Sequence, residues 1–408
     1  MSFGQDARLL AIHGCQSQCC LHDQSSLFVC IPACKMVDTG KSEGWFAHES
    51  RVHERKRKRK VYASQRPCAS REEPLTKVRG LTRWLVHAGQ VGDWGRGGTA
   101  NQRHVAALMG RQSQCYKPSF VLSTGDNFYS HGLRGPHDPY FAQTFTNVYT
   151  SEGLQVPWYS VLGNHDYGEF GGVRGGCMAP EFSLCPKDCC YSASWQDSLT
   201  IPSITGRESV AASDPRWNLK QGVWRKSFGA GDLLDVVFTD TTPFMRRYRH
   251  RAWGNMSGGV LRQDVYKQFV EIQSLMRNSS ATWKLVVGHH PIQSYGEHCN
   301  LRGDRDCLDM QFLKPVLQKY KADFYMSGHD HGIQLLKDPG SGVHFLVSGA
   351  GSNTKRGHFK NVHGNDTLFL SDQPGFVAVS IKGNNLRLDT FSIHSPNPTY
   401  AMSIDKEQ

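Results

Sequence analysis

The sequence predicts an α/β fold, in which strands and helices alternate along the chain. Two observations predict it. Short apolar runs that stop at Gly or Asp recur after residue 98, and such runs are typical of buried strands. Between these runs lie segments with apolar residues at helical spacing. This alternation indicates a sheet with helices packed on its faces.

Each element follows from one of these patterns. Strands are predicted at residues 120–122, 158–162, 236–238, 285–287 and 324–326. One helix is predicted around Val265, Phe269, Ile272 and Met276, and another around Phe312, Val316, Leu317 and Tyr320. Residues 376–381 and 386–393 flank a Lys-Gly-Asn-Asn turn, which predicts a hairpin.

The hydrophobic pattern of the sequence divides the chain into segments. Residues 1–80 show no sustained hydrophobic period and are predicted to be an atypical, disordered N-terminal segment. Residues 81–395 are predicted to form the folded domain, with a Cys-rich insertion at 171–217 and a C-terminal tail at 396–408. No internal repeat is visible.

The basic charge is concentrated in the N-terminal segment. Of the formal charge of +11, residues 1–80 hold 14 Lys and Arg against 8 Asp and Glu. A run of six basic residues lies at 55–60, and such a run could bind a polyanion or act as a nuclear localisation signal. Because blocks of like charge rarely fold, we favour the interpretation that this basic run belongs to a solvated, disordered arm.

Cysteine usage suits an oxidising compartment. The chain has 13 cysteines; four crowd one loop (Cys177, Cys185, Cys189 and Cys190), and Cys299 and Cys307 flank another. Sequence alone does not choose among the pairings, and the spacing of the first four is a poor match to zinc sites. Sequons at Asn255, Asn278 and Asn365 favour a secreted glycoprotein.

Membrane and targeting signals are weaker. No stretch approaches the roughly 20 apolar residues of a spanning helix. The apolar run at residues 27–33 is too short, and lies too far from residue 1, to serve well as a signal peptide.

Polar side chains able to bind metals follow several of the predicted strands, and a glycine precedes each group of them. They are Asp93, Asp126, Tyr129, Asn164, His165, His289, His329 and His331. Ligands of α/β sheets gather beyond the carboxyl ends of strands, and glycine lets the backbone turn sharply there. Each residue alone has an ordinary structural explanation, but five such segments in succession predict a metal site.

Five motifs carry a specific resemblance. They are Asp93-Trp94-Gly95, Gly125-Asp126-Asn127-Phe128-Tyr129, Gly163-Asn164-His165, Val286-Val287-Gly288-His289 and Gly328-His329-Asp330-His331. In this order they resemble the small plant and animal purple acid phosphatases, within the calcineurin-like metallophosphoesterases. The resemblance covers residues 91–395 and implies a four-layer α/β/β/α sandwich with a dimetal centre at one sheet edge.

The resemblance also implies a ligand set. Asp93, Asp126, Tyr129 and His331 would hold Fe³⁺, and Asp126 would bridge to a divalent ion held by Asn164, His289 and His329. The divalent ion would be Zn²⁺, Mn²⁺ or Fe²⁺, since imidazole and amide donors suit all three. His165 and His298 match the family's outer-sphere histidines and are candidates to assist the leaving group.

The implied activity is that of an acid phosphatase. Hydroxide on the metal pair would attack phosphomonoesters, and phosphoanhydrides are plausible substrates too. Small phosphorylated molecules are therefore the expected partners, and nucleic acid is not. The family resemblance, sequons and cysteines together imply a secreted or vacuolar/lysosomal protein.

One segment departs from the family pattern. The apolar strand expected before Asp93 is interrupted by His87, Gly89 and Gln90, and a break there could misplace Asp93. With the atypical first 80 residues, this motivates the hypothesis that the N-terminal region comes from an incorrect gene prediction or an alternative transcript. Sequencing the 5′ end of the transcript tests it.

Two other functions compete. Protein phosphatases and phosphodiesterases of the same superfamily usually carry Asp-x-His at the first motif and lack a tyrosine at position 129, whereas this chain has Gly95 and Tyr129. A non-catalytic polyanion-binding protein would use residues 51–60 and would show salt-sensitive binding to DNA.

Overall fold

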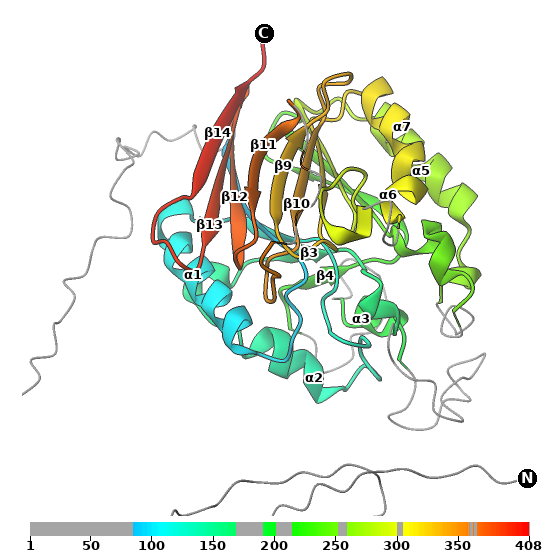
Figure 1. The fold of residues 1–408 in the computed structure, drawn as a ribbon, viewed down its shortest axis with the longest axis vertical. Coiled ribbons are helices and arrows are strands. Elements are labelled where there is room, and N and C mark those ends of the chain that lie inside the picture. Colours follow the sequence, from blue (N-terminus) through cyan, green and yellow to red (C-terminus); the bar gives the residue numbers. More distant parts are fainter. Residues whose placement is uncertain are drawn as a thin grey trace, which may run out of the picture. The chain divides into compact units, whose positions relative to one another are not determined.

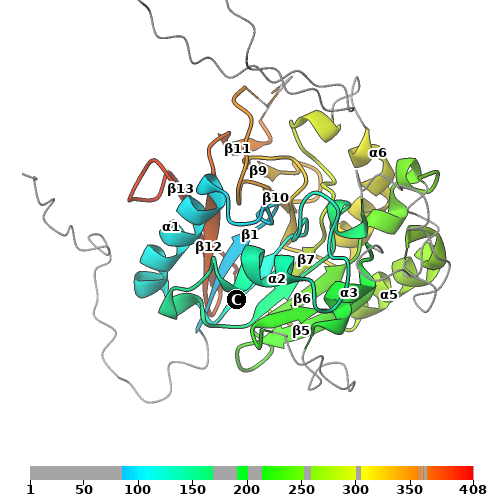
Figure 2. The same cartoon turned by 90° about the horizontal axis from the view of Figure 1, so that it is seen from below.

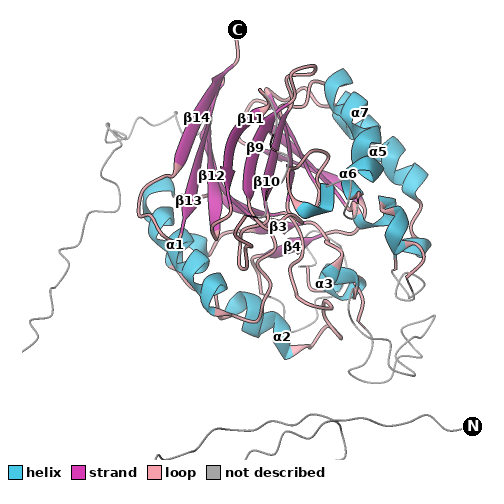
Figure 3. Cartoon of the chain, in the orientation of Figure 1, coloured by secondary structure: helices cyan, strands magenta, loops and turns pink. Residues whose placement is uncertain are grey.

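Two β-sheets packed face to face form the centre of the molecule, with helices on both outer sides (Figure 1). The computed structural model describes residues 85–168, 191–200, 214–251, 259–299, 305–357, 359, 362 and 365–407. The layers confirm the predicted α/β/β/α sandwich (Figure 3). The predicted N-terminal segment, with its basic run, lies outside the described residues.

The first sheet mixes parallel and antiparallel strands in the order β14-β13-β12-β1-β2-β3-β4. Its strands are β1 (Leu85–Val91), β2 (Phe120–Ser123), β3 (Trp158–Ser160), β4 (Trp217–Leu219), β12 (Gly375–Lys382), β13 (Asn385–Ser392) and β14 (Tyr400–Asp405). Strands β1 to β4 are parallel, so their carboxyl ends point to the same edge. The predicted hairpin is confirmed as β12 and β13.

The second sheet has the order β11-β9-β10-β8-β7-β6-β5. Its strands are β5 (Val223–Phe228), β6 (Leu234–Thr239), β7 (Trp283–Val287), β8 (Phe324–Ser327), β9 (Ile333–Lys337), β10 (His344–Ser348) and β11 (Thr367–Ser371). Strands β6, β7, β8 and β10 run parallel. Strands β6 to β8 hold three of the predicted apolar runs.

Helices cover the outer faces of both sheets (Figure 2). The α-helices of the described residues are α1 (Ala100–Tyr116), α2 (Pro139–Phe141), α3 (Ser194–Ser198), α5 (Val265–Arg277), α6 (Asp306–Met310) and α7 (Lys314–Lys319). Helix α1 packs on β1 and β12 of the first sheet, and α5 packs on β5 and β6 of the second. Both predicted helices are confirmed, as α5 and as α7 with the preceding helical turn. No helix in the described ranges combines the length and the apolar composition that a membrane crossing requires.

Local sequence explains where α5 starts. The side chain of Asp264 accepts a hydrogen bond from the backbone N–H of Lys267 at 2.9 Å, which caps the helix. Ile272 and Met276 then face the core, one helical turn apart. The helix is fixed by a cap at one end and by an apolar stripe along its length.

Strand β1 is continuous despite its mixed composition, so the expected break before Asp93 is wrong. His87 places Nδ1 2.8 Å from Ser380 Oγ on β12. Gly89 packs beneath Met109 of α1, and Gln90 is fully buried. Pairing with β2 and β12 on both sides holds the strand in register, which the apolar pattern alone did not reveal.

Two predicted boundaries also change. The residues of the predicted tail include β14, which pairs with β13, so the folded domain extends past residue 395. The edge strand β4 begins at Trp217, the last residue of the predicted insertion, and α3 lies within that insertion. Much of the insertion, including its four cysteines, lies outside the described residues.

Candidate metal centre

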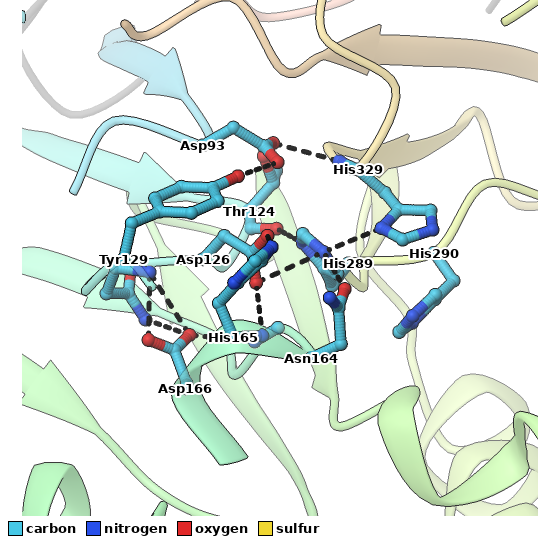
Figure 4. Close-up of polar contacts among 12 residues, drawn as sticks. Asp93, Thr124, Asp126, Tyr129, Asn164, His165, Asp166, His289, His290 and His329 are labelled. Carbon is cyan, nitrogen blue, oxygen red and sulfur yellow. Dashed lines mark hydrogen bonds and ion pairs between the residues drawn. The ribbon is translucent and has the colours of Figure 1, made fainter. Parts of the chain in front are cut away.

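The loops that follow five strands meet at the edge where the two sheets come together (Figure 4). Asp93 follows β1, Asp126 and Tyr129 follow β2, and Asn164 follows β3. The histidines follow strands of the other sheet, with His289 after β7 and both His329 and His331 after β8. The structure therefore brings all seven predicted ligand side chains to one place, from both halves of the sandwich.

The donor atoms form two groups. In the first, Tyr129 Oη lies 2.9 Å from Asp93 Oδ1 and 3.0 Å from His331 Nε2. His331 Nε2 lies 3.5 Å from the same Asp93 oxygen. This group offers a carboxylate, a phenol and an imidazole.

In the second group, His289 Nε2 lies 3.1 Å from Asn164 Oδ1 and 3.2 Å from His329 Nδ1. The carboxylate of Asp126 stands between the groups: its Oδ1 is 3.4 Å from His289 Nε2, and it also interacts with the Tyr129 hydroxyl. Asp126 is therefore placed to serve both groups.

The backbone at the centre is strained. Asp93, Asp126 and His329 have φ angles of 58°, 52° and 70°, in the left-handed region that residues other than glycine rarely adopt. Close approach also fixes a glycine, because a Cβ on Gly163 would lie 2.1 Å from Asp126 Oδ1. The glycines that flank these motifs thus have a steric reason as well as a conformational one.

Hydrogen bonds on the far side of three imidazoles fix their tautomers. His289 Nδ1 lies 2.8 Å from the Thr124 carbonyl, and His165 Nδ1 lies 2.8 Å from the Ser130 carbonyl. His329 Nε2 lies 2.8 Å from Asp306 Oδ2. Because these oxygens only accept, each of the three nitrogens donates, and the other ring nitrogen presents a lone pair to the centre.

The electrostatics of the centre favour a cation. Burial opposes ionisation of Asp126, yet the facing imidazoles of His289 and His165 hold its pKa well below the usual range. Burial likewise opposes charge on His289, but the Asp126 carboxylate raises its pKa to about 10. Burial and then the Asp126 and Asp93 carboxylates raise the pKa of the Tyr129 phenol.

These residues fit a pair of metal ions. Asp93 and Asp126 are 0% and 1% exposed, and buried carboxylates need a positive partner. One oxygen of each lies within 4.8 Å of a nitrogen of His289, a spacing suited to metal binding. Hard oxygen donors gather around Asp93 and nitrogen donors around His329, which matches two ions of different character.

The two predicted catalytic histidines lie on opposite flanks. The His165 and Tyr129 ring centroids lie 4.2 Å apart, with the rings tilted by 45°, and His165 Nε2 is 3.9 Å from Asp126 Oδ2. The His298 ring lies 4.0 Å from the ring of His329. His290 Nδ1 lies 2.8 Å from Thr241 Oγ1, and the same hydroxyl oxygen accepts from the backbone N–H of His289.

Sequence reasoning missed several supporting residues. Asp166 accepts hydrogen bonds from the backbone of Gly163, Asn127 and Phe128 at 2.8 to 3.1 Å, tying together the loops after β2 and β3. Burial and then the nearby Asp126 carboxylate raise the pKa of Asp166 to about 7. Its place directly after the Gly-Asn-His motif was an available signal.

Two arginines and one acid were also missed. Arg96 stacks over the Tyr129 ring at 3.6 Å, Arg247 lies 2.8 Å from Asp306, and Asp306 reaches His329. Arg247 lies in the helical turn Arg246–Tyr248 and Asp306 begins α6, and neither falls within a recognisable motif. Only the folded structure brings them to the centre.

Comparison with known proteins agrees with this geometry. Residues 87–332 match the calcineurin-like phosphoesterase family. Purple acid phosphatase 3 of Arabidopsis thaliana is 35% identical over 341 residues, which are 81% of this chain and 81% of that protein. Purple acid phosphatase 17 of the same plant is 38% identical over 71% of this chain and 75% of its own length.

A solved structure supports the fold. The GAP50 protein, described as the anchor in the inner membrane complex of Plasmodium, superposes with a TM-score of 0.59 over 79% of this chain and 90% of its own. Its sequence is 21% identical, so this likeness concerns the fold. The family match and the Arabidopsis relatives place this chain among the purple acid phosphatases of the calcineurin-like phosphoesterase family.

Proposed function

We propose that this chain is an acid phosphatase that hydrolyses phosphomonoesters at a dinuclear centre of Fe³⁺ and a divalent ion. The observation that carries the proposal is the position of Asp126 between two groups of donor atoms, one rich in oxygen and one in nitrogen. Asp126 would hold both ions within reach of one phosphoryl group, where they would supply the charge that phosphoryl displacement needs.

The donor chemistry assigns an ion to each group. Asp93, Tyr129 and His331 would hold Fe³⁺ together with Asp126, because carboxylates and a phenolate are hard anionic donors. Asn164, His289 and His329 would hold Zn²⁺, Mn²⁺ or Fe²⁺ with the same Asp126. The ions would supply positive charge against the phosphoryl oxygens and lower the pKa of a reacting water.

Protein groups around the centre hold these donors in place. The Thr124 carbonyl keeps the Nε2 lone pair of His289 directed inward, and the Asp93 carboxylate accepts from the backbone N–H of His329 at 2.9 Å. Arg96 lies over the face of Tyr129, where its charge stabilises the phenolate form. The site is thus arranged before substrate arrives, which lowers the reorganisation needed for reaction.

In this proposal, His165 and His298 would assist the leaving group. His165 donates through Nδ1 to the Ser130 carbonyl, so its Nε2 faces the centre. In the imidazolium form, this nitrogen would donate to a phosphoryl oxygen or deliver a proton to the leaving group. His298 stands beside His329 on the other flank. The leaving alkoxide would take its proton from one of these two imidazoles.

The lack of space at Gly95 disfavours the other activities of the superfamily, those of protein phosphatases and phosphodiesterases. A Cβ at this position would lie 1.8 Å from the carbonyl oxygen of Asn127, so the histidine of an Asp-x-His motif does not fit here. The same loop supplies Tyr129, whose N–H donates to the Gly95 carbonyl at 2.7 Å. The purple type of centre is the one that this backbone accommodates.

We further propose that the protein passes through the secretory route. The Cys299–Cys307 disulfide supports an oxidising compartment. Two of the three sequon asparagines, Asn278 and Asn365, are exposed and open to glycosylation. Asn255 lies outside the described residues.

The visible absorption spectrum tests the proposed function. We expect a purple band in the purified protein, loss of that band in Tyr129→Phe, and hydrolysis of a phosphomonoester at mildly acidic pH. Metal analysis should give one iron and one divalent ion per chain. A colourless, active protein would contradict the ferric assignment, and a colourless, inactive protein would contradict the proposed function.

A further inference from the structure

Asp306, the first residue of α6, contacts His329 on the side away from the metal centre. Its Oδ2 lies 2.8 Å from His329 Nε2, and the two side chains are 1% and 3% exposed. Because the carboxylate accepts this bond, Nε2 carries the proton and Nδ1 keeps its lone pair. That Nδ1 lies 3.2 Å from His289 Nε2, among the nitrogen donors.

We propose that Asp306 is a positioning residue for the divalent ion: it orients the His329 ring and fixes the tautomer that offers Nδ1 as a ligand. The inference rests on the proposed function, because it assigns His329 to the divalent ion. A carboxylate that bonds the far nitrogen of a ligating imidazole also makes the near nitrogen a stronger donor.

Two features hold Asp306 in this position. Arg247 Nη2 lies 2.8 Å from the same carboxylate oxygen. The next residue, Cys307, is bonded to Cys299. Cys299 directly follows His298, so the disulfide links the start of α6 to the loop that carries the second catalytic candidate.

A purely structural role is the competing interpretation. Asp306 could serve only as the buried counter-charge of Arg247, with its contact to His329 incidental. The two roles differ in what they control. A positioning role acts on the affinity for the divalent ion, whereas a structural role acts on the stability of the whole chain.

Helix α6 offers a matched control. Asp309 lies in the same five-residue helix and binds Arg246 at 2.6 Å, and Arg246 is an exposed side chain. Asp309→Ala therefore removes a carboxylate and an ion pair from α6 without touching His329.

The experiment measures metal binding directly. Asp306→Ala, Asp306→Asn and Asp309→Ala are stripped of divalent ion with a chelator and titrated with Zn²⁺. We expect Asp306→Ala to bind Zn²⁺ about 10- to 100-fold more weakly than the parent. The purple band should persist, because Tyr129 and Asp93 lie in the other donor group. Asp306→Asn keeps an acceptor and should weaken binding less, and Asp309→Ala should match the parent.

Kinetics separate positioning from structure. At saturating Zn²⁺, kcat of Asp306→Ala should recover to within a few-fold of the parent with KM for the ester unchanged, which a structural defect would not allow. Parental Zn²⁺ affinity in Asp306→Ala overturns the inference. If Asp306→Ala does not fold, parental affinity in Asp306→Asn overturns it instead. A parent that binds neither iron nor zinc contradicts the proposed function, an outcome distinct from these.

Discussion

Left-handed backbone at Asp93, Asp126 and His329 marks the metal centre at the scale of single residues. Each such conformation costs on the order of 1–3 kcal/mol and persists only where the surroundings enforce it. Here the enforcing contacts lie within the centre itself: the Asp93 carboxylate accepts from the backbone N–H of His329, and Asp126 accepts from that of His165. Residues of the centre thus hold one another's backbone in place.

The residues of the centre could be predicted because each sits inside a short motif. Asp93, Asn164 and His289 each follow a strand within a few residues, so chain order alone placed them at one edge. Asp306 and Arg247 could not be predicted in this way. They reach His329 only because α6 and the 246–248 turn fold over the centre, and such long-range contacts leave no periodic pattern in the sequence.

His165 gives a prediction at the same scale. Replacing it in His165→Asn should lower kcat by roughly 10²- to 10⁴-fold, because an asparagine neither donates nor takes a proton in the reaction. Iron content and the purple band should stay at parental levels. The assay is steady-state hydrolysis of a phosphomonoester across acidic pH, with the exposed His104 on α1 changed to Ala as a control. A parental kcat in His165→Asn would exclude its proposed role.

At the scale of elements, strand β1 shows why its composition alone wrongly predicted a break before Asp93. Its polar interruptions are each accommodated by neighbours: His87 by a side chain on β12, and Gly89 by α1 and β2. The strand is held from both sides by backbone pairing, which depends on partners far along the chain. Strands β2, β6, β7 and β8 were predicted correctly, because their burial produces apolar runs that are visible locally.

Gln90 of this strand is a buried polar residue whose side chain lacks a hydrogen-bond partner among the described residues, and it gives the second prediction. It lies on the same face as Val86 and Ala88, between the sheets, and neither its side-chain oxygen nor its nitrogen has a hydrogen-bond partner among the described residues. Gln90→Met has nearly the same shape and should raise the free energy of unfolding by about 1–3 kcal/mol.

Gln102 provides the matched control for that change. It is equally buried, but it accepts from the backbone of Arg96 and Gly98 and donates to the Thr144 carbonyl at 2.8 Å. Gln102→Met should therefore destabilise the protein, where Gln90→Met stabilises it. Denaturant titration of both variants measures the difference, and a loss of stability in Gln90→Met would show that Gln90 has a partner after all.

At the scale of the whole molecule, the centre joins the two sheets. Asp93, Asp126 and Asn164 come from the first sheet, and His289, His329 and His331 come from the second. An ion bound by both sets therefore ties the halves of the sandwich together, and its binding energy contributes to the stability of the folded domain.

Removal of the metals tests this coupling. An ion present at 100 times its Kd stabilises a protein by about 2.7 kcal/mol. Stripping both ions by reduction and chelation should lower Tm by roughly 5–10 °C, with one cooperative transition before and after. Calorimetry of both forms gives the comparison, with re-addition of iron and zinc as the control for reversibility. Two separate transitions in the stripped protein would mean that the sheets unfold independently.

The lack of space at Gly95 has an evolutionary consequence. A lineage that exchanges this type of centre for an Asp-x-His type must enlarge residue 95 and move the 126–129 loop away from it. Enlarging residue 95 first drives a Cβ into the Asn127 carbonyl, and moving the loop first displaces Asp126 and Tyr129. Both intermediates would be unfit, so the two kinds of enzyme are separated by a fitness valley that single substitutions do not cross.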